Sequence, residues 1–85
     1  MCLLSSAMKY IIFDDRGLDV PVIFPPHWDH AQTAQKFPGK VVLSAGFVEM
    51  DDSGKIVARG ASRSLKVESR PEDTDTIIRA LKFRL

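Results

Sequence analysis

The sequence predicts a single α+β domain with the element order ββαββα. Its 85 residues, 45% hydrophobic content and net charge of +1 are typical of one folded domain, not of a disordered chain. Two runs of β-forming residues precede each of two helix-like segments, and turns rich in glycine, proline or aspartate separate them. We therefore expect an antiparallel sheet of about four strands, with two helices packed on one of its faces.

The first two strands are expected to form a β-hairpin. Residues 9–14 (KYIIFD) and 18–24 (LDVPVIF) are rich in β-branched and aromatic side chains, and they flank a D-D-R-G turn. Gly17 supplies the positive φ that such turns need. Pro21 has no amide hydrogen, so the second strand should lie at a sheet edge or carry a bulge there.

A short helix should follow over residues 27–36. Pro25 and Pro26 end the strand, and a proline suits the first helical turn, where its missing N–H is not needed. Pro38-Gly39 ends the helix. Its apolar residues recur at helical spacing and would face the sheet: Trp28, Ala31, Ala34 and Phe37.

The second half begins with a strand over residues 41–50 (VVLSAGFVEM). Its small central residues, Ser44 to Gly46, indicate a bulge or the close approach of another segment. After a D-D-S-G turn, residues 55–62 are expected to form a fourth strand. Residues 65–67 either prolong this strand or form a fifth short one.

The last helix has the clearest start signal. Ser69 stands three residues before Glu72, the spacing of a reciprocal capping box, and Pro71 suits the first turn. We therefore expect Ser69 to cap this helix. Its apolar stripe consists of Ile77, Ile78, Leu81 and Leu85.

Both histidines and the only tryptophan lie within residues 27–30. His27 and His30 would share one helix face, but two ligands are too few for a zinc site unless a symmetric dimer supplies four, so no metal is predicted. Trp28 either anchors the helix on the sheet or offers an exposed aromatic contact. His27, Trp28 and His30 are therefore the predicted partner-binding residues, together with any open sheet edge.

A basic segment supports an alternative function. Residues 55–70 contain five basic side chains and one acidic side chain. If residues 55–65 are extended, Lys55, Arg59 and Arg63 share one strand face, where they could contact phosphates or protect an edge from aggregation. No aromatic residue is interleaved for base stacking. The candidate anion or nucleic-acid contacts are Arg59, Arg63, Lys66 and Arg70.

Nothing in the sequence indicates catalysis. The aspartate pairs at 14–15 and 51–52 fit turn chemistry, and neither a phosphate-binding loop nor a nucleophile elbow occurs. Cys2 has no second cysteine with which to form a disulfide. We therefore expect a protein that is not an enzyme and has no cofactor and no catalytic residues.

The N-terminal residues predict neither a signal peptide nor a membrane span. Residues 1–7 lack a basic region and are too short, so we expect a disordered extension before a domain over residues 8–85, with Met8 as a possible native start. A cytoplasmic protein without membrane contact is expected. Because so short a chain buries little surface, homodimerisation is also expected.

Three stretches carry a resemblance to a known group. In order along residues 8–81 they are KYIIFDD, IFPPHWDHAQTA with VLSAGFV after it, and SLKVESRPEDTDTI. Together they resemble small uncharacterised proteins encoded by bacteriophages and prophages. The resemblance implies an accessory protein that binds a host or phage protein in a bacterial cytoplasm, and it implies no role for any single residue.

Overall fold

The computed structural model describes residues 7–84, and side chains within residues 7–81. The predicted N-terminal extension therefore lies outside the described residues except for Ala7, and so does Leu85 of the predicted apolar stripe. In chain order the elements are β1 (Met8–Asp15), β2 (Leu18–Phe24), α1 (His30–Ala34), β3 (Val41–Met50), β4 (Ile56–Arg59), β5 (Ala61–Ser62), β6 (Val67–Glu68) and α2 (Asp73–Arg84).

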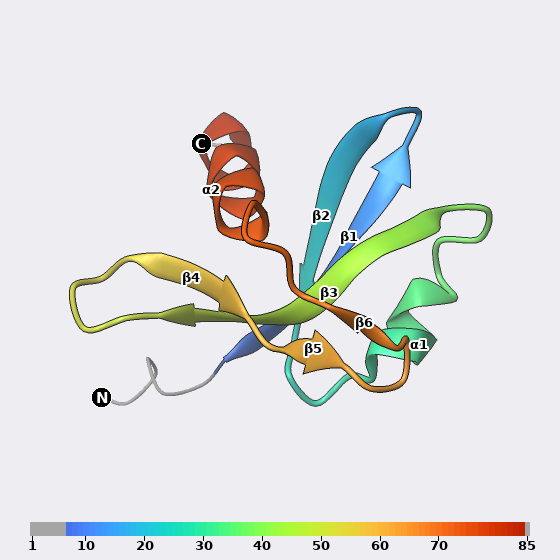
Figure 1. The fold of residues 1–85 in the computed structure, drawn as a ribbon, viewed down its shortest axis with the longest axis horizontal. Helices are drawn as coiled ribbons and strands as arrows, with labels where there is room; N and C mark the ends of the chain where they lie inside the picture. The colour runs from blue at the N-terminus through green and yellow to red at the C-terminus, as the bar shows by residue number, and fades with distance from the viewer. Residues whose placement is uncertain (1–6, 85) are drawn as a thin grey trace.

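Four strands form one antiparallel sheet in the order β2-β1-β3-β4. The sheet twists strongly, so the β1–β2 hairpin and the β3–β4 hairpin run in clearly different directions in Figure 1. β5 and β6 pair separately as a small second hairpin. The α+β class and the four-stranded antiparallel sheet are thus confirmed.

The first hairpin forms as its turn residues predict. Arg16 and Gly17 both have positive φ, 58° and 86°, which is the geometry of a two-residue type I′ turn. The Gly17 N–H donates to Asp14 Oδ1 at 2.9 Å and closes the turn. β2 is an edge strand, as the missing amide hydrogen of Pro21 predicted.

The two helices cover opposite faces of the sheet, so the prediction that both pack on one face is wrong. Tyr10 and Ile12 of β1 lie in a core cluster with Ile77 and Leu81 of α2. Ile11 and Phe13 lie in a second cluster, which includes Ala34 of α1. Side chains alternate between the faces of a strand, and the central run YIIF is apolar at every position. Both faces of β1 therefore need a cover.

The fourth predicted strand breaks in the middle. β4 ends at Arg59, Gly60 takes a φ of 89°, and the chain turns into the β5–β6 hairpin. This hairpin lies on the same face as α1, because Leu65 and Val67 pack in the α1 cluster. The ββαββα order therefore gains a hairpin, and residues 55–62 are not one strand.

Both helices start later than predicted. Asp29 caps α1, since its Oδ2 accepts hydrogen bonds from the N–H groups of Ala31 (2.9 Å) and Gln32 (3.2 Å). Pro26 precedes the helix by four residues and does not start it. α2 begins at Asp73, and it is the Arg70 N–H that donates to the Asp73 side chain three residues on, at 2.9 Å. The capping-box spacing is therefore used one residue later than Ser69.

The small centre of β3 allows the close approach that its composition indicates, and a bulge lies directly before it. The register with β1 shifts between Ile12 and Phe13, whose partners are Ser44 and Val42, so a bulge lies at Leu43. At Gly46, an added Cβ would lie 2.5 Å from the Arg59 carbonyl oxygen. Glycine is therefore needed where β3 meets the end of β4.

Candidate functional site

The three predicted partner-binding residues do not share a surface. His30 is only 4% exposed, whereas Trp28 is 40% exposed and His27 is exposed in the turn before α1. Because the helix starts at His30, the expected common helix face of His27 and His30 does not form. Within residues 7–84, no group of three or more His, Cys, Asp or Glu side chains is placed to hold a metal ion.

His30 is a core residue that seats α1 on the sheet. Its ring makes edge contacts with Phe24 (5.5 Å between centroids) and Phe47 (5.8 Å). Its Nε2 lies 3.0 Å from the Gly46 carbonyl oxygen, an acceptor, so Nε2 carries the hydrogen that it donates. Burial lowers the pKa of His30, and the hydrogen bond to Gly46 offsets this only in part.

Trp28 lies at the rim of a polar hollow beside α1. Its ring stacks at a tilt of 28° on Phe24, with 6.4 Å between centroids, and the Lys36 Nζ lies 4.5 Å from the centroid of the Trp28 ring. The hollow has a volume of about 260 Å³. It is lined by His27, Trp28, Gln32, Thr33 and Lys36. We call it the Trp28 pocket.

The predicted basic row is divided among three environments. Arg59 forms a 3.8 Å ion pair with Glu49 across the β3–β4 pair. Arg63 and Lys66 are exposed in the β5–β6 turn. The guanidinium of Arg70 forms ion pairs with neighbouring carboxylates. The predicted row of Lys55, Arg59 and Arg63 on one strand does not form, because β4 ends at Arg59, and contact of the four candidate residues with anions stays a prediction.

Sequence analysis did not identify the buried polar network around Asp73, because its contacts with Tyr10 and Asp19 join segments far apart in the chain. The Asp73 carboxylate is 0% exposed and accepts hydrogen bonds from Tyr10 Oη (2.6 Å) and Arg70 Nε (2.9 Å). Arg70 Nη2 also donates to Asp19 Oδ2 at 3.1 Å, and its Nη1 lies 3.6 Å from Glu72 Oε2. The network therefore joins β1, β2 and the start of α2.

The network keeps the Asp73 carboxylate ionised and the Tyr10 phenol protonated. Burial raises the pKa of Asp73, but hydrogen bonds from Tyr10 and the Arg70 amide outweigh this, so the pKa lies below its usual range. Burial and the hydrogen bond to Asp73 both raise the pKa of the Tyr10 phenol. The Ser44 hydroxyl is buried and also helps to lower the pKa of Asp73, although its geometry falls short of a hydrogen bond to any described group. These features fix α2 on the sheet.

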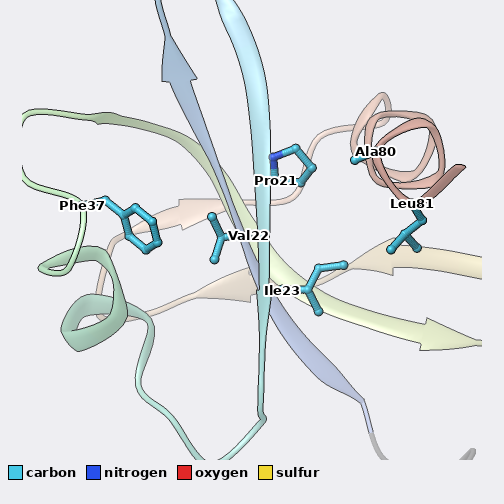
Figure 2. A pocket seen from close by; sticks show the side chains of 6 residues that line it. All are labelled: Pro21, Val22, Ile23, Phe37, Ala80 and Leu81. Carbon is cyan, nitrogen blue, oxygen red and sulfur yellow. The ribbon is translucent and has the colours of Figure 1, made fainter. Parts of the chain in front are cut away.

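The outer edge of β2 runs along an apolar groove. Figure 2 shows Pro21 and Ile23 pointing toward Ala80 and Leu81 of α2, while Val22 points to the other side, toward Phe37. The hollow has a volume of about 420 Å³. We call it the β2 groove; its lining residues are Pro21, Val22, Ile23, Phe37, Ala80 and Leu81.

The β2 edge also has unpaired backbone groups. In a two-residue hairpin the pair next to the turn, here Asp15 and Leu18, is hydrogen-bonded, and bonded and non-bonded pairs alternate from there. The backbone of Asp19, Pro21 and Ile23 therefore faces outward. No described group pairs with the outward N–H groups of Asp19 and Ile23.

The opposite edge of the sheet is partly closed. On β4, the Ala58 N–H donates to the Thr74 hydroxyl of α2 at 2.9 Å. The first turns of α2 thus cover the part of β4 that would otherwise pair with another strand. Of the two edges of the four-stranded sheet, β2 is the more available one.

Comparisons with known proteins indicate neither a family nor a function for this chain. No family model matches the chain, and no curated protein or solved structure matches it. The resemblance to phage and prophage proteins therefore stays a prediction. Neither helix within residues 7–84 combines the length and apolar character needed to cross a membrane.

Proposed function

We propose that this protein is a non-enzymatic binding module that recognises an extended, apolar segment of another protein along the β2 groove. The observation that carries the proposal is the coincidence of an apolar hollow with an open strand edge. Exposed apolar hollows on small proteins are typical of contact sites, and open edges bind extended segments by strand addition.

The backbone of β2 offers a partner few hydrogen bonds, so we expect side-chain contacts to contribute more to recognition than backbone pairing does. Asp19 and Ile23 each present an N–H and a C=O, whereas Pro21 between them presents only a C=O. A partner strand would gain few backbone bonds, so the apolar contacts on both sides of the edge must supply much of the affinity.

The same proline disfavours a second copy of the chain as the occupant. In a symmetric antiparallel pairing of two β2 edges centred on Pro21, the two proline rings would face each other where amide hydrogens are needed. We therefore infer that the partner is a different protein. The homodimer stays a prediction, to be checked by light scattering.

The proposed setting follows from the phage resemblance. An accessory protein of a phage or prophage acts in the bacterial cytoplasm, where its partner would be a host or phage protein. The absence of a catalytic motif in the sequence supports a binding role over an enzymatic one.

The test uses Ala80→Arg, which places a long charged side chain in the groove wall at a helical position that tolerates arginine. Ala61→Arg on exposed β5 is the matched control. Proteins captured from bacterial lysate by the wild type should be retained by the Ala61 variant and lost by the Ala80 variant. With the purified partner, the Asp19 and Ile23 amides should exchange more slowly.

Two outcomes would contradict the proposal. One is a purified partner that binds the wild type and the Ala80 variant equally well. The other is a homodimer that Ala80→Arg dissociates, because the groove would then be covered by a second copy of this chain.

A further inference from the structure

We propose that the Trp28 pocket binds a nucleotide unit, with a planar base against the Trp28 ring and a phosphate at Lys36. The observation behind this proposal is that the fold places an exposed aromatic ring, a hollow and several cations together on the face that holds α1 and the β5–β6 hairpin. In the sequence, Trp28 and Lys66 are 38 residues apart. The inference does not depend on the β2 groove or its partner.

Trp28 is held in place before any ligand arrives. Its backbone N–H donates to the Pro25 carbonyl at 3.1 Å, and its backbone carbonyl accepts from Lys9 Nζ at 2.8 Å. Phe24 supports the ring from within the α1 cluster. A ring that is already fixed loses little conformational freedom on binding, so stacking retains most of its free energy.

Lys36 can move from the ring to a phosphate. Its ammonium lies over Trp28 at 4.5 Å, but a cation–π contact at an exposed site contributes only about 0.5–1 kcal/mol. A phosphate forms a stronger, charge-assisted hydrogen bond with the same ammonium. Contact with a phosphate would draw Lys36 aside and free the ring face for a base.

The size and chemistry of the hollow fit a single base. Its volume of about 260 Å³ is below the usual range of roughly 300–1,000 Å³ for sites that enclose a whole ligand. Gln32 and His27 line it and can form hydrogen bonds with the edge of a base. The rest of the nucleotide would lie outside.

The neighbouring turn extends the positive surface. The Ser64 hydroxyl accepts a hydrogen bond from the Ala31 N–H at 3.2 Å, which holds the β5–β6 turn against the start of α1. Arg63 and Lys66 on that turn are exposed. Figure 1 shows the turn lying beside α1. A second phosphate of the same strand could contact it.

Cations outnumber carboxylates on this face. Asp29 accepts the first amides of α1, and Glu68 lies on β6. Two further carboxylates of this face, Asp15 and Glu49, are paired with Lys40 and Arg59. The remaining two, Asp29 and Glu68, face four cations that are in no ion pair with a described carboxylate: Lys9, Lys36, Arg63 and Lys66. The excess favours an anionic ligand, and the aromatic ring favours one that carries a planar base over a plain acidic peptide.

The experiment titrates a fluorescently labelled oligothymidylate and follows its anisotropy at two salt concentrations. We expect salt-sensitive binding that Trp28→Ala weakens by about tenfold and Trp28→Phe largely restores. Lys36→Gln should weaken binding and lower the salt slope by about one, while Lys55→Gln, the same change on the β3–β4 turn, should leave both unchanged. Circular dichroism checks that each variant is folded.

The two sources of a nucleotide give different results. Thymidine monophosphate, followed by quenching of Trp28 emission, should bind with the same dependence on Lys36. If the natural ligand is a single strand, the double change Arg63→Gln, Lys66→Gln should weaken the oligonucleotide and not the mononucleotide. If it is a free nucleotide, this variant should affect neither.

The proposal is overturned if neither probe binds. It is also overturned if polyglutamate binds as tightly as the oligonucleotide and Trp28→Ala changes neither affinity, because the face would then be a general surface for polyanions. Ala80→Arg should leave nucleotide binding intact, which separates failure here from failure at the β2 groove.

Discussion

Asp73 keeps a negative charge inside the molecule because groups from three segments compensate it. Tyr10 donates from β1, Arg70 donates from its amide and guanidinium, and Asp19 of β2 holds the other side of that guanidinium. Removing one member of such a network leaves the others buried without a partner, which costs more than the hydrogen bond itself.

Asp73→Asn should therefore lower the free energy of unfolding by about 3 kcal/mol, measured by urea denaturation. Asp75→Asn, an exposed carboxylate in the same helical turn, is the control and should change it by less than about 0.5 kcal/mol. Equal effects of the two changes would mean that Asp73 acts only on the helix dipole.

His30 predicts how stability depends on pH. Burial holds its pKa in the folded protein below the unfolded value of about 6.5; Lys9 lowers the pKa further, while the Gly46 carbonyl and Asp29 raise it. Above about pH 6.5 both states are neutral, so the group contributes no pH dependence. As the pH falls below 6.5, only the unfolded chain takes up the proton at first, and stability declines.

We expect the melting temperature to fall between pH 7 and pH 5 in the wild type and in His27→Gln. His30→Gln keeps a hydrogen-bond donor for Gly46 and cannot take up the proton, so its decline should be smaller. If His30→Gln shows the same decline as the wild type, the buried imidazole is not its cause.

Local sequence signals reveal only part of the residue-scale picture. The turn residues Asp14 and Gly17 and the edge residue Pro21 act as predicted, because turn and edge chemistry depends on near neighbours. Tyr10 and Asp73 are 63 residues apart, and no local pattern joins them. The Arg70-to-Asp73 spacing was a detectable signal, but the preceding Ser69 and Glu72 fit the same capping pattern.

At the scale of elements, the existence of strands and helices could be predicted and their placement could not. The YIIF run of β1 is apolar on both faces of the strand, so each face needs a cover, and the expected arrangement with both helices on one face would leave the other face of β1 open. The bend at Gly60 could not be predicted, because glycine also occurs within strands. It produced the β5–β6 hairpin, which carries Arg63 and Lys66 to α1.

Gly46→Ala tests how closely β3 and β4 approach. The new methyl group would collide with the Arg59 carbonyl, which belongs to the backbone and cannot rotate away. We expect a loss of about 2 kcal/mol in unfolding free energy and weaker NMR contacts between Phe47 and Arg59.

Gly54→Ala is the comparison for that change. This turn glycine has open space around it but a φ of 86°, so the substitution should cost about 1 kcal/mol through backbone strain alone and leave the strand contacts intact. Loss of the Phe47–Arg59 contacts in both variants would contradict the steric explanation.

For the whole molecule, the two proposed surfaces depend on segments that only the fold brings together. The β2 groove joins β2, the segment after α1 and the second half of α2. The Trp28 pocket lies next to a turn that belongs to the other half of the chain. Sequence periodicity identified candidate residues such as Trp28, but it could not indicate that His30 is buried or that Arg70 is engaged by carboxylates.

The availability of the β2 edge is the claim on which the proposed function depends, and amide hydrogen exchange measured by NMR tests it directly. The N–H groups of Val20 and Val22 face β1, whereas those of Asp19 and Ile23 face outward. We predict fast exchange at Asp19 and Ile23 and slow exchange at Val20 and Val22 in the free protein. Equal protection at all four amides would show that something already covers this edge.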